Sequence, residues 1–256
     1  MNNAKKNNKS FIITLLLSLL ILALAVAAFI PTIVSRNART EATSSMSDMD
    51  AEAMRVLGCC NAYAAANDFS TTMNGSVKAN VIGVKYTQKI HGSRTVDVKY
   101  QAFAEVAESK SALVKAALKR EGRDGVFYVS RGSYKRKSFT YDNEQKLTKS
   151  NYIAQYGQPF TGVVKYNLDG TVITAEQLSD NTFRYVLDPA RSTLYSRNEV
   201  KTTLGGKSYP EYSHVEFTLT VDGDRPIKVT TVEKFKIDKF GGTSCTAEYN
   251  EIFKFN

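Results

Sequence analysis

The chain contains few residues of the types that most often carry out catalysis or bind transition metals. Its two histidines are His91, expected in a turn, and His214, which alternation along a predicted strand places beside Glu216. A histidine next to a glutamate on the exposed face of a strand is far more often a solvated pair than a general base. We therefore expect no enzyme activity, no cofactor and no metal site.

A Gly-Gly-Lys-Ser run at residues 205–208 imitates the end of a phosphate-binding loop. Such a loop needs a further glycine at the position of Lys201, a strand before it and a helix after it. Here a predicted helix comes before the run and a predicted strand follows, which excludes a nucleotide site.

The net charge of +9 is unevenly distributed, because several positive charges flank the hydrophobic N-terminal run. These charges belong to Lys5, Lys6, Lys9, Arg36 and Arg39. The remaining excess is too small to predict nucleic-acid binding.

The three cysteines, Cys59, Cys60 and Cys245, are too few for a disulfide scaffold and have the wrong spacing for a metal site. Cys60 and Cys245 both fall on predicted apolar faces. In an exported domain, a disulfide between them would fasten the opening helix to the last strand, with Cys59 as a substitute partner. The alternative is two buried free thiols, which pack as small hydrophobic side chains.

The last third of the chain predicts three antiparallel strands, at residues 211–222, 227–238 and 243–256, joined by turns that contain Gly or Pro. In the third strand, apolar and polar side chains alternate, and only Glu251 interrupts the apolar face. That face carries Cys245, Ala247, Tyr249, Phe253 and Phe255. This period of two is typical of a sheet with one covered face and one wet face.

Residues 48–67 predict a helix whose apolar stripe includes Val56 and Leu57. If helices lie over the apolar face of the sheet, the space between them is an apolar cleft, the ordinary form of a ligand site. The candidate ligand-binding residues are Val56, Leu57, Tyr249, Phe253 and Phe255. The alternative is that the helices fill this face as a solid core.

The middle of the chain predicts further hairpins and short helices. We expect strands at 75–90 and 94–106 around a turn at 91–93, a helix at 109–120, and strands at 126–130 and 134–141 around a turn at 131–133. A helical or irregular stretch at 143–156, a weak strand at 162–166, a hairpin at 171–187 and a helix at 189–204 follow. Because the strands come in hairpins and the helices are few, the predicted class is α+β with an antiparallel sheet.

Four basic residues, Arg131, Lys135, Arg136 and Lys137, cluster around one predicted hairpin. They could contact acidic lipid head groups, at about 1 kcal/mol per charge near an anionic surface. The other interpretation is a solvated edge hairpin whose charge prevents pairing with strands of other molecules.

The N-terminal segment predicts a membrane anchor. Residues 11–30 form an uncharged run of twenty residues, which is the length needed to cross a bilayer as a helix. The apolar character continues to Val34. The lysines before this run place residues 1–10 in the cytoplasm, with a transmembrane anchor at 11–34, a linker at 35–47 and an extracytoplasmic domain at 48–256. The alternative is a cleaved signal peptide, for which Ala-Val-Ala at 25–27 fits the cleavage pattern, and the domain is then secreted.

The order of these elements resembles that of periplasmic lipoprotein carriers of the LolA and LppX type. The resemblance rests on the opening helix 48–67, the long hairpin 75–106, the segment 141–159, the junction 182–189 and the closing strands with their Asp-Gly-x-x-Pro turn at 222–226. It covers most of residues 48–256. It implies a curved, open, half-barrel-like antiparallel sheet whose concave face is covered by helices and holds a lipid or other apolar ligand.

The predicted anchor departs from this pattern, since such carriers are soluble or attached by a lipidated cysteine. The combination predicts a tethered lipid-binding domain at a cell membrane. The second interpretation is a non-enzymatic structural or protein-interaction module of the cell envelope, with a solid core.

Overall fold

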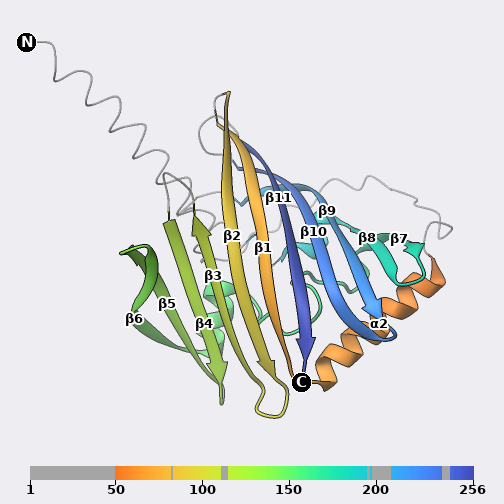
Figure 1. Cartoon of the computed structure of the whole chain (residues 1–256), viewed down its shortest axis with the longest axis horizontal. Coiled ribbons are helices and arrows are strands. Elements are labelled where there is room, and N and C mark those ends of the chain that lie inside the picture. The colour runs from red at the N-terminus through yellow and green to blue at the C-terminus, as the bar shows by residue number, and fades with distance from the viewer. Residues whose placement is uncertain (1–49, 82, 111–114, 195–196, 198–208, 238–242) are drawn as a thin grey trace, which may run out of the picture.

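The computed structural model describes residues 50–81, 83–110, 115–194, 197, 209–237 and 243–256. In this part of the chain, eleven strands form a single antiparallel sheet in the order β6-β5-β4-β3-β2-β1-β11-β10-β9-β8-β7 (Figure 1). The chain enters at the centre of the sheet, moves strand by strand to one edge, crosses to the other edge and returns to the centre. The first and last strands are therefore neighbours there.

The first half of the sheet comprises β1 (Phe69–Val81), β2 (Val84–Asp97), β3 (Ala102–Lys110), β4 (Lys115–Arg123), β5 (Val126–Lys135) and β6 (Ser138–Thr148). The second half comprises β7 (Val172–Ser179), β8 (Thr182–Leu187), β9 (Glu211–Asp222), β10 (Arg225–Ile237) and β11 (Thr243–Phe255). The helices are α2 (Ala51–Ala66), α3 (Lys149–Tyr156) and α4 (Pro189–Ser192). The three predicted C-terminal strands and the predicted hairpin at 171–187 are confirmed.

One face of the sheet, the inner face, carries the core, and the opposite open face is polar. The alternation is strict in β9, where Val215, Phe217, Leu219 and Val221 are buried and the residues between them are not. The same period continues in β10 and β11. Figure 1 views the molecule from the open face, with α3 behind the strands.

The opening helix α2 forms where the sequence predicts it. The Asp50 side chain accepts hydrogen bonds from the backbone N–H groups of Glu52 (2.8 Å) and Ala53 (3.3 Å), which caps the helix N-terminus. Its apolar stripe is buried against β7 and β10, and the Tyr185 hydroxyl donates a 2.6 Å hydrogen bond to the Ala53 carbonyl oxygen. These contacts hold α2 directly on one half of the inner face.

The predicted helix at 109–120 is wrong, because residues 109–110 end β3 and residues 115–120 belong to β4. The residues of β4 have high intrinsic helix propensity, but pairing with β3 and β5 overrides it. Ala117 and Leu118 are adjacent and both buried. In a strand these two neighbours point to opposite faces of the sheet, so their burial is not evidence for the apolar stripe of a helix.

The predicted turns at 91–93 and 131–133 are also wrong, since both lie inside strands. A Cβ atom on Gly92 would lie 2.9 Å from Met73 Cε, and one on Gly132 would lie 2.7 Å from Ala117 Cβ. Each glycine therefore marks close packing inside the sheet. The β5–β6 turn instead uses Arg136 and Lys137, with φ of 48° and 71°.

The inner face is not covered by helices alone, which corrects the predicted arrangement. The helix α2 covers the half near β7–β10, and α3 packs on β5 and β6. Between them, the centre is covered by residues 157–167, which have no helix or strand and are called the crossing segment below. The crossing segment begins at Gly157, whose φ of 76° ends α3. It includes residues 162–166, so the weak strand predicted there does not form.

Two further expectations lie wholly or partly outside the described residues. The predicted helix at 189–204 begins as α4 at the expected Asp188 cap, and most of its remainder is not described. The predicted anchor at 11–34 and linker at 35–47 are not described either. No helix within the described ranges has the length and hydropathy to span a bilayer.

The predicted disulfide is absent, since all three cysteines are free thiols. Arg55, on the same helix as Cys60, has its Nη1 atom 3.9 Å from Asp224 Oδ1, in the turn just before β10. Cys245 pairs instead with Phe235, near the other end of that strand. At ~3.3 Å per residue this separates Cys60 from Cys245 by roughly 30 Å, far beyond the ~7 Å between Cα atoms that a disulfide spans.

The buried thiols should be nearly inert in the native protein. Burial raises the pKa of both Cys60 and Cys245 to about 12, which leaves a thiolate fraction of about 10⁻⁴ at pH 8. We expect an aromatic disulfide reagent to titrate only the half-buried Cys59 quickly, and all three thiols after denaturation without reductant. The Cys59→Ser variant should lose the fast phase. A single thiol in the denatured, unreduced protein would show that a disulfide does form.

Candidate functional site

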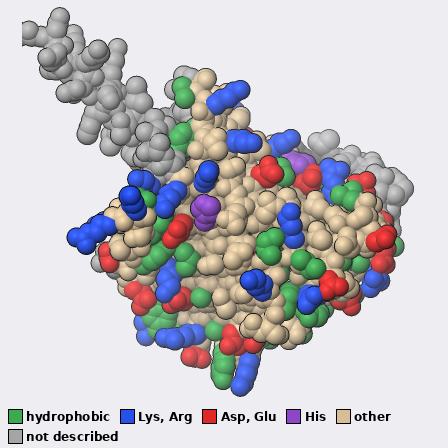
Figure 2. All heavy atoms as spheres, viewed as in Figure 1, with side chains coloured by type: hydrophobic (Ala, Val, Ile, Leu, Met, Phe, Trp, Pro, Cys, Tyr) green, Lys and Arg blue, Asp and Glu red, His purple; other side chains and the backbone are tan. Residues whose placement is uncertain are grey.

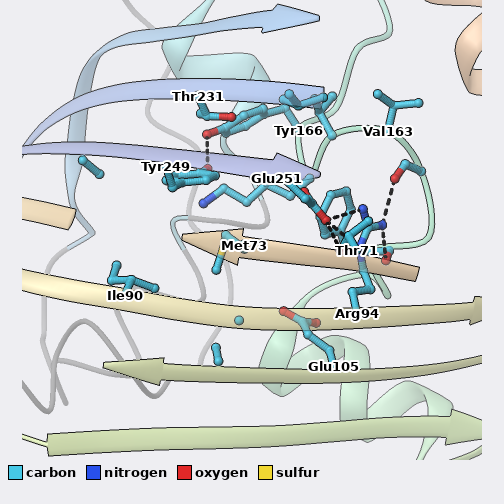
Figure 3. A pocket seen from close by; sticks show the side chains of 18 of the residues that line it. Thr71, Met73, Ile90, Arg94, Glu105, Val163, Tyr166, Thr231, Tyr249 and Glu251 are labelled. Carbon is cyan, nitrogen blue, oxygen red and sulfur yellow. Dashed lines mark hydrogen bonds and ion pairs between the residues drawn. The ribbon is translucent and has the colours of Figure 1, made fainter. Parts of the chain in front are cut away.

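A cavity of about 330 Å³ lies between the centre of the inner face and the crossing segment (Figure 3). Its sheet side is formed by β1, β2, β3, β10 and β11, with one residue each from β4 (Arg120) and β9 (Tyr212). Ligand sites for small molecules commonly occupy ~300–1,000 Å³, so the cavity suits one small ligand.

Small side chains in the middle of the sheet create this space. Gly92 and Ala107 face each other in the register of β2 and β3, and both line the cavity. The apolar part of the wall continues toward one end of the sheet, where Ile90, Val77 and Ala247 lie. Met73 and Ile90 project into this region in Figure 3.

A buried ion pair closes the opposite end of the cavity. Arg94 Nη2 lies 2.7 Å from Glu251 Oε1, and the two side chains are only 3% and 8% exposed. The Thr71 hydroxyl donates to the same carboxylate oxygen over 2.6 Å. The other terminal nitrogen of Arg94 donates to the carbonyl oxygens of Phe160 (3.0 Å) and Gly162 (2.8 Å).

This arginine therefore joins the sheet to its cover. Its guanidinium carbon also lies 3.6 Å from the centroid of the Phe160 ring, a favourable cation–π arrangement. Figure 3 shows Arg94 reaching Glu251 on one side and the crossing segment on the other.

A second ion pair continues the row across the sheet. Arg120 Nη2 lies 2.7 Å from Glu105 Oε1, and Glu105 stands opposite both Arg94 and Arg120 in register. Charges of alternating sign thus follow one another from β11 to β4, and each positive charge has a carboxylate beside it.

A third polar group lies where the crossing segment meets β10 and β11. Lys165 Nζ lies 3.0 Å from Glu233 Oε1, and the Tyr166 hydroxyl donates to the same oxygen. The hydroxyl oxygens of Tyr166 and Tyr249 are 3.0 Å apart. Burial raises the pKa of Tyr166, and it raises that of Tyr249 to about 12, so both hydroxyls stay protonated at neutral pH.

Two buried polar side chains beside the cavity lack hydrogen-bond partners. The amide nitrogen and oxygen of Gln88 and the hydroxyl oxygen of Ser109 have none among the described residues. Gln88 stands opposite Val77 in register and Ser109 opposite Ile90, and both of these neighbours line the cavity. Buried polar groups are nearly always hydrogen-bonded, so these two are exceptions, although neither side chain itself lines the cavity.

Of the five predicted ligand-binding residues, only Tyr249 lines the cavity. Val56, Leu57 and Phe253 are buried in the main hydrophobic core, because α2 packs directly on the sheet at their level. Phe255 is half-buried, with its ring 4.9 Å from that of Tyr63. The cavity lies further along the strands, beneath the crossing segment.

The residues that the sequence did not single out are the charged ones, Arg94, Lys165, Glu233 and Glu251. Glu251 did leave a signal, since it interrupts the apolar face of the last strand. The four predicted head-group residues, Arg131, Lys135, Arg136 and Lys137, are exposed and do not line the cavity.

The arrangement offers little for metal or acid–base chemistry. Within the described ranges, no three His, Cys, Asp or Glu side chains are grouped to hold a metal ion. His214 Nε2 lies 3.2 Å from Glu216 Oε2, as alternation predicts, and Arg184 pairs with the same carboxylate at 2.7 Å. That the chain is not an enzyme stays a prediction.

No protein-family model and no curated protein matches this sequence. Among solved structures, it aligns with a LolA superfamily protein from Nitrosomonas europaea at 8% identity, covering 78% of this chain and 93% of that one, with a TM-score of 0.27. A DUF1329 family protein from Desulfovibrio piger gives 8% identity, coverage of 79% and 91%, and a TM-score of 0.30. A domain assigned to outer membrane lipoprotein sorting, from Vibrio parahaemolyticus, aligns at 11% identity with a TM-score of 0.32. The alignment covers 80% of this chain and 93% of that domain.

The first of these structures is named as a LolA superfamily protein and the third as a lipoprotein-sorting domain. The TM-scores are low, and the function proposed below therefore rests on the residues of the cavity.

The buried ion pair should dominate the stability of the site. In Arg94→Met, Glu251 keeps a buried charge without its partner, and we expect the free energy of unfolding, measured with urea, to fall by about 3–5 kcal/mol. Adding Glu251→Leu should recover much of that loss, because it removes the uncompensated charge.

Arg184→Met is the matched control, since its pair with Glu216 is 39% and 20% exposed. We expect it to cost no more than about 1 kcal/mol. Equal losses in the two single variants would show that the pair at Arg94 is not a special determinant of stability.

Proposed function

We propose that this chain is a membrane-tethered, extracytoplasmic binding protein that holds one lipid-like ligand in the cavity beneath the crossing segment. The observation that carries the proposal is the cavity of about 330 Å³ at the centre of the inner face. Its apolar wall favours an acyl chain, because each buried CH₂ contributes about 0.8 kcal/mol. An eight-carbon chain would thus gain roughly 6 kcal/mol before the entropic cost of binding.

The polar groups around the cavity narrow the chemistry of the ligand. Arg94, Arg120 and Lys165 each lie within 3.0 Å of a carboxylate oxygen, so an anionic group would have to compete with these carboxylates. An uncharged polar group, such as an ester, an amide or a hydroxyl, does not compete with these carboxylates and therefore fits the charged end of the cavity better than an anion.

The volume favours a ligand with a single chain. At the lower end of the usual range for ligand sites, the cavity suits one acyl chain with a small polar group, rather than a lipoprotein anchor with several chains.

The location in the envelope rests on the sequence. The uncharged run at 11–30 and the lysines before it favour an anchor with a cytoplasmic N-terminus and residues 48–256 outside the membrane. Cleavage after 25–27 would release the same domain.

A second candidate function is a cell-envelope interaction module without a ligand. It is favoured by the way α2 packs directly on the sheet, with Val56 and Leu57 in the main core. In this case the cavity is a packing space beneath an irregular cover.

Native mass spectrometry of residues 40–256, exported and purified without detergent, tests the proposal. This fragment contains every described helix and strand. We expect a reproducible added mass that organic extraction removes and that is identified as a lipid. A protein mass that stays bare after incubation with mixed lipids would overturn the proposal and favour the interaction module.

Filling the cavity should abolish the added mass. Ala107 lines the cavity, so Ala107→Phe places an aromatic ring in the space that the ligand needs. Ala104 lies on the same strand but does not line the cavity, which makes Ala104→Phe the control for folding and expression. Equal ligand occupancy in the two variants would place the ligand elsewhere.

A further inference from the structure

The tip of the β5–β6 hairpin projects basic side chains from one end of the sheet. Lys135, Arg136 and Lys137 are all exposed, and φ is 48° at Arg136 and 71° at Lys137. Two consecutive residues with positive φ are typical of the tight two-residue turn of a hairpin. The turn therefore presents these charges at the end of two paired strands.

Two lysines from neighbouring strands gather around an aromatic pair at the base of this tip. Lys115 Nζ lies 4.3 Å and Lys110 Nζ 4.7 Å from the centroid of the Tyr134 ring. The Phe139 ring lies 5.0 Å from that of Tyr134, edge to face. We call Lys110, Lys115, Tyr134, Lys135, Arg136 and Lys137 the basic rim.

The charges of the basic rim are not neutralised by neighbouring acids. In the part of the chain that the structure describes, none of its five basic side chains forms an ion pair. Glu108, two residues before Lys110 on β3, instead accepts a 3.0 Å hydrogen bond from Tyr141. Figure 2 shows Lys and Arg gathered toward the left and upper side of the open face, and Asp and Glu mostly toward its lower and right sides.

Protection of a sheet edge does not account for this arrangement. The edge strand is β6, whereas Lys110 and Lys115 lie on β3 and β4, which are paired on both sides. Charges that prevent strand pairing belong on the edge strand itself. A cluster that continues onto interior strands and includes a half-buried tyrosine fits a binding surface better.

An exposed apolar side chain lies at the same end of the sheet. The ends of β1, β3 and β5 and the starts of β2, β4 and β6 share that end, because these strands are consecutive and antiparallel. Val84, which follows the β1–β2 turn, is 66% exposed and is followed by the exposed Lys85. Lysines around aromatic and aliphatic side chains are the usual composition of surfaces that lie at a membrane interface.

We propose that the basic rim docks the domain on a lipid bilayer that bears anionic head groups. The unpaired ammonium and guanidinium groups bind lipid phosphates, and the Tyr134 ring lies at the level of the head groups. Docking orients the domain relative to the bilayer, with the strands running away from the membrane. The inference rests on the proposed membrane tether and is independent of the ligand in the cavity.

The absence of tryptophan from the sequence gives a direct test. The full chain carrying Tyr134→Trp has one tryptophan, at the basic rim, and is placed in lipid nanodiscs without detergent. With anionic phosphatidylglycerol at low salt, we expect a blue-shifted emission that brominated lipids quench. In nanodiscs of phosphatidylcholine alone, or in high salt, we expect the emission of an exposed tryptophan, because screening weakens attraction to the surface.

Charge reversal at the tip should abolish the shift. Adding Lys135→Glu and Lys137→Glu removes the attraction, whereas Lys99→Glu with Lys254→Glu changes the same charge at exposed positions at the other end of the sheet and should leave the shift unchanged. An emission that is the same in both lipid compositions, or a shift that survives reversal at the tip, overturns the proposal. A chain that does not stay in the nanodiscs contradicts the tether itself, and is seen separately by size-exclusion chromatography.

Discussion

The fold depends on the hydrogen bonds of one buried arginine. Arg94 bonds to Glu251 through Nε (3.1 Å) and Nη2 (2.7 Å), and to two carbonyl oxygens of the crossing segment through Nη1. A buried charge is tolerated only where such partners replace the water that it loses. Here they bind β2, β11 and an irregular stretch of backbone in one network, so a cover without regular secondary structure stays fixed over the sheet. Because that cover packs less closely than a helix, space for a ligand remains beneath it.

The parts of the fold that the sequence predicted correctly have local causes. The alternation in β9, β10 and β11 and the capped stripe of α2 are each encoded within a dozen or so residues. The errors lie at Gly92 and Gly132, where glycine permits close packing between strands instead of a turn, and in β4, where helix-forming residues are held extended by both neighbours. Such constraints come from residues on other strands, which local patterns do not report.

The site was harder to predict than the fold for the same reason. Arg94 and its partner are 157 positions apart in the sequence, and neither residue has a neighbour in the chain that reveals the pair. Glu251 interrupts an apolar face, which marks a position where a buried charge needs a partner, but the partner is known only once β1 and β11 are paired. Tyr249 was found because it shares the apolar face of its strand, although it serves the cavity through its hydroxyl group as much as through its ring.

The central position of β11 has a consequence for how the protein reaches its native state. β11 is the last of the described elements in sequence order, yet it pairs with β1 on one side and β10 on the other. Until it is in place, the two halves of the sheet each expose a long unpaired strand, and contacts of such large sequence separation form slowly. If the domain is exported as proposed, the sheet cannot be complete until β11 has crossed the membrane. Between the emergence of β1 and that of β11, the incomplete sheet is open to aggregation and proteolysis.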